Sequence, residues 1–164
     1  MNDGMPFGLG LGMPVKIDRP LEVRCDDLTR LPPAGYLGPM FFMAPVLIDV
    51  LDQIGETLYQ TIPVIVSDDH SEPSARTISG VVSLQNIECM DKVKSRFDSD
   101  EDDPEDVVSI RKLVLDLNKI PPNRHLFRVE EAPWILVASQ KLVEELLCRS
   151  VTGIKFTPIE EYRI

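Results

Sequence analysis

The spacing of apolar residues changes along the chain, and it predicts two helices. The clearest helical spacing, at intervals of three and four residues, joins Leu47, Val50, Leu51 and Ile54. Pro45 stands at the first turn, where its missing amide hydrogen is harmless, and Gly55 stands where this helix would end. The sequence therefore predicts one amphipathic helix between these two residues.

A second helical pattern lies near the end of the sequence. Its apolar face is predicted to hold Leu142, Val143, Leu146 and Leu147. Ser139 precedes it as an N-cap whose hydroxyl can accept a hydrogen bond from a free backbone amide. Gly153 lies close beyond the last periodic residue, where a left-handed exit costs a glycine little.

Alternating or continuous apolar residues predict extended segments between and around these helices. The expected strands or extended pieces are 15–17, 21–25, 41–43, 62–66, 77–89, 107–117, 126–129, 133–137 and 154–158. The prolines and glycine of 32–35 favour a loop. Six to eight strands with two main helices predict an α+β fold with a mixed, mostly antiparallel sheet.

Two parts of the chain follow a similar order. Residues 39–44 align with 133–138, and each precedes a helix and then an alternating segment. The chain is thus expected to contain two related strand–helix–strand units packed on the sheet. Chance similarity between two generic amphipathic units explains the same pattern, since apolar strands and helices are common.

The C-terminal part also resembles a known family. Its features are the cluster 125–129, the strand ending at Ser139, the helix start at Lys141 and Leu142, and the segment 153–156 followed by Pro158. This order resembles the C-terminal signature of the imm-eleven family of bacterial immunity proteins, and a weaker resemblance covers 41–89. The resemblance implies a non-catalytic protein that binds and neutralises a cognate toxin domain. It does not specify the toxin chemistry, and the acidic charge described below makes a nuclease the class that we favour.

Length and composition predict one domain over residues 1–164, with 1–13 as a flexible arm. Cys25, Cys89 and Cys148 are far apart and lack metal-ligand spacing, which favours three reduced thiols. The first residues lack the basic start of a secretory signal, and the longest apolar run, 40–48, is too short to span a bilayer. We therefore expect a soluble, cytoplasmic protein.

The formal net charge of −10 is concentrated in one acidic loop, 98–106. Its seven carboxylates belong to Asp98, Asp100, Glu101, Asp102, Asp103, Glu105 and Asp106. These residues are the candidate partner-binding site, since a dense negative field attracts a basic protein and repels nucleic acid and anionic membranes. The alternatives are a solvated linker, or a non-enzymatic adaptor or scaffold that binds a basic partner through this loop.

No residue pattern in the sequence forms a recognisable catalytic or cofactor site. Asp98, Asp100 and Asp102 match the first positions of an EF-hand loop, but Asp103 and Ser109 replace its glycine and final glutamate. His70 and His125 lack partners at the spacing of a catalytic triad or metal pair. We expect no cofactor and no enzyme activity, and a metal-dependent enzyme is the least favoured alternative.

The sequence also predicts whether two side chains of the C-terminal part are buried or exposed. Trp134 opens an apolar strand and is expected in the core. Arg128 is expected to point outward from its strand and to pair with Glu130 or Glu131 at the surface.

Overall fold

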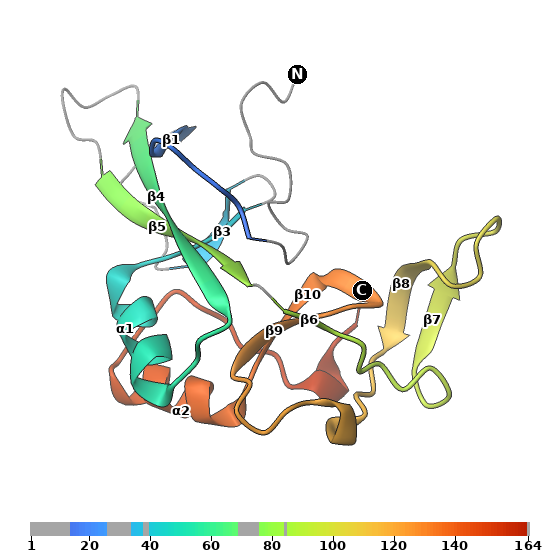
Figure 1. The fold of residues 1–164 in the computed structure, drawn as a ribbon. Helices are drawn as coiled ribbons and strands as arrows, with labels where there is room; N and C mark the ends of the chain where they lie inside the picture. Colours follow the sequence, from blue (N-terminus) through green and yellow to red (C-terminus); the bar gives the residue numbers. More distant parts are fainter. Residues whose placement is uncertain (1–13, 26–33, 38–39, 69–75, 84, 164) are drawn as a thin grey trace.

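The computed structural model describes residues 14–25, 34–37, 40–68, 76–83 and 85–163. Within these ranges the chain forms two α-helices and ten β-strands (Figure 1). Five of the seven strand pairings are antiparallel and two are parallel. The predicted α+β class is confirmed, although the strands are divided among sheets of five, three and two strands.

The five-stranded sheet has the order β1-β4-β5-β3-β2. Its members are β1 (Leu21–Cys25), β2 (Ala34–Leu37), β3 (Met40–Met43), β4 (Tyr59–Asp68) and β5 (Arg76–Ser83). Ile62, Val64 and Val66 of β4 are buried at alternate positions, as their spacing predicts, and pack with Val15. The expected loop at 32–35 is wrong for its second half, since Ala34 and the next residue pair with β3.

Both helices begin where the sequence predicts, and α1 also ends there. The second helix ends earlier than expected, because the left-handed residue that follows it is Ser150 (φ 56°), three positions before Gly153. In α1 (Pro45–Ile54) all four residues of the predicted apolar face are buried, and Gly55 ends the helix at φ 83°. In α2 (Gln140–Cys148) Ser139 caps the first turn by accepting a hydrogen bond from the Leu142 amide at 3.2 Å. Leu147 departs from the prediction, because 61% of it is exposed.

The helices pack against each other on one side of the molecule (Figure 1). Their shared core combines buried residues of both helices with one residue each of β3 and β9: Met43, Leu47, Val50, Leu51, Ile54, Leu126, Leu142 and Leu146. The second helix therefore packs mainly against the first.

The three-stranded sheet has the order β10-β9-β6 and lies at the centre of the view in Figure 1. Its strands are β6 (Asn86–Ile87), β9 (Leu126–Val129) and β10 (Ala132–Ala138). The single strand expected over 77–89 is instead divided between β5 and β6, which belong to different sheets. β6 pairs in parallel with β9 and so carries the chain into a separate core.

Both side-chain predictions for this sheet are wrong. Arg128 is only 5% exposed, because β9 is the central strand of this sheet and all four of its residues are buried. Its Nη1 donates a hydrogen bond to the Pro133 carbonyl at 2.6 Å. Trp134 is 42% exposed, since it stands where the pairing of β10 with β9 shifts register. Such an irregularity interrupts the regular alternation of side chains along a strand, which the sequence prediction assumed.

The segment 154–158 is not a strand, so the second strand–helix–strand unit lacks its last element. Ile154 and Phe156 are half-buried against the core of the two helices, while their neighbours are exposed. The alternation is real, but it reflects side-chain packing of an extended segment without a partner strand. A 3-10 turn, η3 (Ile159–Glu161), follows.

Glu56 joins the first half of the chain to the second. Its side chain is fully buried, and its carboxylate accepts hydrogen bonds from the backbone amides of Thr57, Leu58, His125 and Leu126 at 2.7–3.2 Å. Arg124 adds an ion pair at 3.2 Å. This carboxylate therefore fixes the end of α1 to the start of β9 across about 70 residues of sequence.

Candidate partner-binding surface

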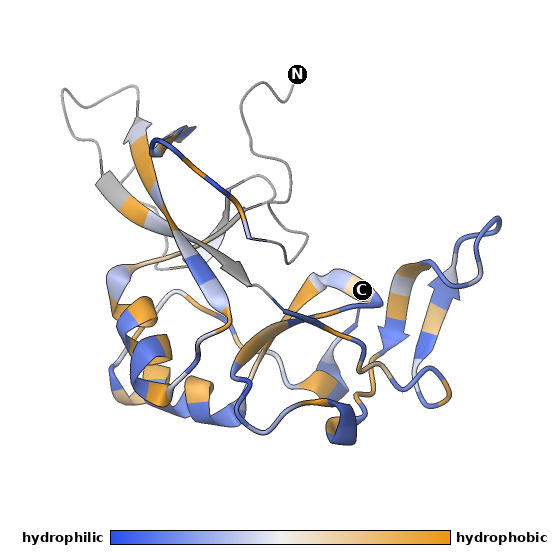
Figure 2. Ribbon diagram, viewed as in Figure 1, coloured by the Kyte–Doolittle hydropathy of each residue, from blue (hydrophilic) through white to orange (hydrophobic). Residues whose placement is uncertain are grey.

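The acidic run lies at the end of a β-hairpin that projects from the body of the protein (Figure 1). Its strands are β7 (Arg96–Ser99) and β8 (Val107–Lys112), which form a two-stranded sheet of their own. Residues 100–106 connect them and are all exposed. We call these seven residues the acidic tip; in Figure 2 the connection is drawn in hydrophilic colours.

Asp98 belongs to β7, not to the tip, and its carboxylate already has partners. It accepts a hydrogen bond from the Ser109 hydroxyl at 2.7 Å and forms an ion pair with Arg111 Nη2 at 2.6 Å. The Ser109 hydrogen bond, followed by that of Arg111, holds the pKa of Asp98 below its ordinary value. Asp98 therefore stabilises the pairing of the two strands.

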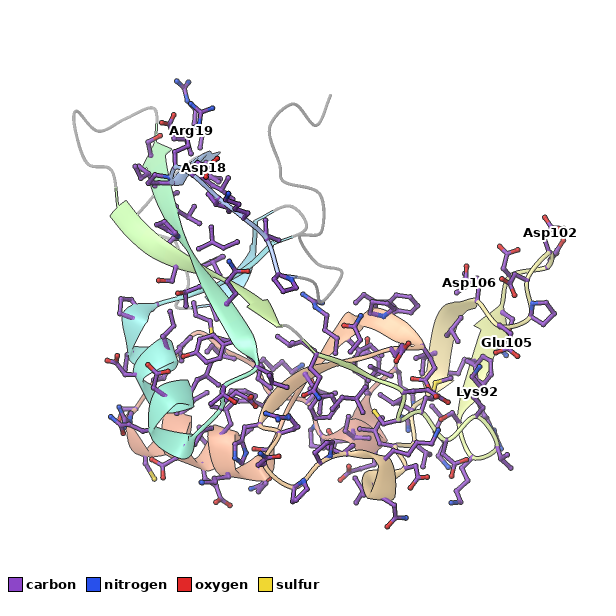
Figure 3. All side chains as sticks on the ribbon, in the orientation of Figure 1. Asp18, Arg19, Lys92, Asp102, Glu105 and Asp106 are labelled. Atoms are coloured by element: carbon purple, nitrogen blue, oxygen red, sulfur yellow. The ribbon has the colours of Figure 1, made fainter. Side chains whose placement is uncertain are left out.

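Glu105 is also paired within the protein. Its carboxylate lies 2.8 Å from Lys92 Nζ, in the segment that leads into β7 (Figure 3). This hydrogen bond raises the pKa of Lys92. The contact ties the tip to the base of the hairpin.

The other five predicted residues face solvent. They are Asp100, Glu101, Asp102, Asp103 and Asp106. No Lys or Arg forms an ion pair with them in the part of the chain that the structure describes, and Asp102 lies at the far end of the hairpin in Figure 3. Asp100 and Asp103 accept hydrogen bonds from backbone amides two residues later, at 2.9 and 3.0 Å, so the connection has a defined turn.

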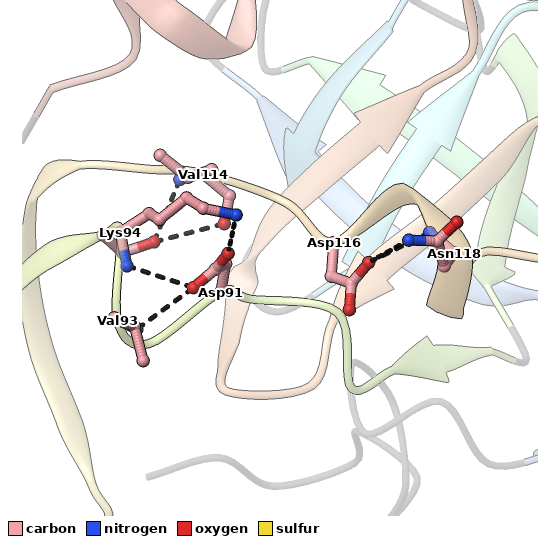
Figure 4. Close-up of polar contacts among 7 residues, drawn as sticks. Asp91, Val93, Lys94, Val114, Asp116 and Asn118 are labelled. Carbon is pink, nitrogen blue, oxygen red and sulfur yellow. Dashed lines mark hydrogen bonds and ion pairs between the residues drawn. The ribbon is translucent and has the colours of Figure 1, made fainter.

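Polar contacts also fix the base of the hairpin (Figure 4). The buried Ser95 hydroxyl bonds both the carbonyl and the amide of Val114, at 3.1 and 3.0 Å. The Asp91 carboxylate accepts hydrogen bonds from the backbone amides of Val93 and Lys94, and it forms an ion pair with the Lys94 ammonium at 2.8 Å. The strands therefore leave the body from an ordered turn, which fixes the direction in which the tip projects.

A group of cations at the hairpin base has no signal in the sequence. Arg96, Arg111, Lys112 and Arg163 line an open groove of about 530 Å³ together with Ser95 and Phe97. Only Arg111 and Lys112 are neighbours in the sequence, so no charge run indicates the group. We call this feature the basic groove.

The sequence predicts no catalytic or metal role for either histidine, and the structure describes one of the two. His70 lies outside the described residues. His125 is buried, and its Nδ1 lies 2.8 Å from the Ser139 hydroxyl, a contact that their 14-residue separation does not predict. Burial, with a contribution from Lys141, lowers the pKa of His125. Because Ser139 also caps α2, the pair links the start of β9 to this helix.

The described residues contain no group of three His, Cys, Asp or Glu side chains arranged to hold a metal ion. None of the helices placed by the structure is both long and apolar enough to cross a membrane. Cys89 and Cys148 are free thiols, the first buried and the second exposed.

A model of the Immunity protein family (Imm11) matches residues 38–161. This range contains both helices, the three-stranded sheet and the whole β7–β8 hairpin. The chain therefore belongs to this family of immunity proteins, and the resemblance carried by 125–158 is confirmed. Among curated proteins, nothing matches the chain.

Proposed function

We propose that this protein binds a cognate toxin domain and neutralises it without catalysis. Membership of the immunity protein family is the observation that carries the proposal. Inhibition then follows from occupying or covering a functional surface of the toxin, so one inhibitor molecule is needed for each toxin molecule.

The acidic tip supplies the charge expected of one contact surface. Its exposed carboxylates project on a hairpin whose base is fixed, so they are available to a partner without unfolding the body. Such a field favours a basic protein surface through attraction at a distance. Of the seven residues proposed from the sequence, Asp98 and Glu105 hold the hairpin together, and the remaining five are proposed to face the partner.

A nuclease is the toxin class that this charge fits best. A groove that holds nucleic-acid phosphates must be basic, and carboxylates presented by an inhibitor can take the place of those phosphates. The protein itself is not expected to bind nucleic acid, because its net charge of −10 repels a polyanion.

The test combines this chain with the toxic domain encoded by the neighbouring reading frame. Co-expression should restore growth, and the two purified proteins should form a stable complex. In a titration, residual toxin activity should fall in proportion to added inhibitor and reach its minimum near equimolar amounts. Complete inactivation by a small fraction of an equivalent would indicate a catalytic mechanism. Absence of both binding and protection would leave a scaffold for another basic protein as the better hypothesis.

A further inference from the structure

The basic groove is unusual for this chain because it collects cations in an acidic protein. The sequence has 17 Lys and Arg residues against 27 Asp and Glu residues, yet four exposed cations line this one groove. Arg96 comes from β7, Arg111 and Lys112 come from β8, and Arg163 comes from the segment after η3. The fold thus gathers these charges from three parts of the chain.

The strand register brings like charges together. Arg96 is the pairing partner of Lys112, while the next pair joins Phe97 to Ile110. Arg111 is therefore an extra residue in β8, and it stands with Lys112 opposite a single residue of β7. Like charges directly opposite each other destabilise a strand pair. Bulges commonly redirect side chains at binding sites.

Compensation for these charges within the described chain is incomplete. Arg111 pairs with Asp98, and Arg163 donates from Nη1 to the carbonyl of Tyr162 at 2.7 Å. No ion pair to Arg96, Lys112 or Arg163 is present among the residues that the structure places. An anionic group entering the groove would offset the repulsion between Arg96 and Lys112.

The position of the groove favours a protein carboxylate as that group. The acidic tip lies at the other end of the same two strands. At about 3.3 Å per strand residue, β7 and β8 separate the tip from the groove by roughly 15–20 Å. A partner that covers the hairpin therefore meets negative charge at the tip and positive charge at the base. A long polyanion such as nucleic acid would be attracted at one end and repelled at the other.

We propose that the basic groove binds acidic side chains of the same toxin whose basic surface meets the acidic tip. This inference rests on the proposed function and adds the chemistry of a second contact. Arginine can bind a carboxylate through two parallel hydrogen bonds, which fixes orientation as well as adding affinity. The hairpin would then recognise a toxin surface on which a basic region lies beside an acidic one, and a uniformly basic surface would be a poorer partner.

The test measures binding kinetics with the toxin domain inactivated at its catalytic residue. The groove variant combines Arg96→Ala with Lys112→Ala, both at exposed positions. The control combines Lys16→Ala with Arg19→Ala, which removes the same charge from two exposed positions. Arg19 lies away from the hairpin, as Figure 3 shows. We expect the groove variant to dissociate at least about tenfold faster, because loss of contacts in an interface acts mainly on dissociation. The control should stay within about twofold of the parent.

Three outcomes would overturn the inference. Dissociation at the parent rate would show that the groove is not a contact, while binding by the parent would leave the proposed function intact. Melting of the free groove variant several degrees below the parent would show that the cations serve the fold, since relief of repulsion should leave it equally or more stable. Inorganic pyrophosphate that binds the parent at micromolar concentration, but not the groove variant, would indicate a phosphate site. Failure of the parent itself to bind would count against the proposed function.

Discussion

At the scale of single residues, Glu56 is the most consequential polar group that the structure describes. Replacing it in Glu56→Gln keeps the size of the side chain but places amide hydrogens against backbone donors and leaves Arg124 without its carboxylate. Breaking a buried ion pair from one side costs on the order of 3 kcal/mol. We expect a loss of about that size in the free energy of unfolding, measured by urea denaturation at pH 7.

The exposed Glu130→Gln is the matched control and should change stability by less than about 0.5 kcal/mol. A comparable loss in both variants would contradict the special role of Glu56.

Burial has the largest single effect on the pKa of Glu56 and acts to raise it. The backbone hydrogen bonds, led by those from His125 and Leu58, together outweigh burial and hold the pKa below its ordinary 4.5.

The folded-state pKa of Glu56 lies below the unfolded value. Its contribution to the free energy of unfolding is therefore fully present above about pH 4.5 and is lost as the pH falls through the folded-state pKa. The stability difference between the parent and Glu56→Gln should therefore shrink in acid. Denaturation curves at pH 7, 5, 4 and 3 measure this difference. A constant difference would show that the carboxylate charge does not matter to the fold.

The free thiols should differ sharply in reactivity. Burial, assisted by the negative charge of Glu131, raises the pKa of Cys89 to about 12, so almost no thiolate is present at neutral pH. Cys148 is exposed at the end of α2. Iodoacetamide at pH 8 should label Cys148 in the native protein and Cys89 only after denaturant is added, as followed peptide by peptide in a mass spectrometer. Equal native labelling would mean that the Cys89 site opens readily.

At the scale of elements, α2 offers a direct test of helix orientation. Leu146 is 5% exposed in the core shared by the helices, whereas Leu147 is 61% exposed. Leu146→Asp should bury an unpaired charge and lower the free energy of unfolding by several kcal/mol, a large part of a typical domain's stability. Leu147→Asp, one position later, should change it by less than about 1 kcal/mol. Similar melting temperatures for the two variants would mean that the helix faces the core differently.

The elements that the sequence predicts well are those defined by local periodicity. The faces of α1 and the buried side of β4 follow from spacing alone, and Gly55 and Ser139 mark helix ends through local backbone chemistry. The segment 154–158 has the same kind of alternation but no neighbouring strand, and whether an extended segment joins a sheet depends on distant residues. The sequence does not indicate β7, because this strand is short and largely polar and its structure depends on pairing with β8.

At the scale of the whole molecule, the two charged surfaces of the hairpin differ in how far the sequence indicates them. The acidic tip follows directly from a dense run of carboxylates, although only the structure assigns Asp98 and Glu105 to internal ion pairs. The basic groove combines residues as far apart as Arg96 and Arg163. Its detection requires the strand register and the path of the C-terminal segment, neither of which a single sequence specifies.

The last prediction concerns how the tip meets the toxin. The variant replaces the five solvent-facing acids of the tip, Asp100, Glu101, Asp102, Asp103 and Asp106, by Asn or Gln. Asn at positions 100 and 103 retains an oxygen for the turn hydrogen bonds, and the pairs of Asp98 and Glu105 remain intact. The hairpin should therefore keep its shape while losing the charge of its tip.

Rim charges act mainly on the rate of association, and exposed ion pairs are individually worth under about 1 kcal/mol. Association of the tip variant with the toxin should be roughly tenfold slower at low salt, and the difference from the parent should shrink as salt screens the charges. The control neutralises five exposed acids elsewhere: Asp18, Glu22, Asp49, Glu144 and Glu160. It changes the net charge equally, so a smaller effect there would place the attraction at the tip. Equal slowing in both variants would assign it to net charge, and unchanged association of the tip variant at low salt would make the tip a solvated turn outside the interface.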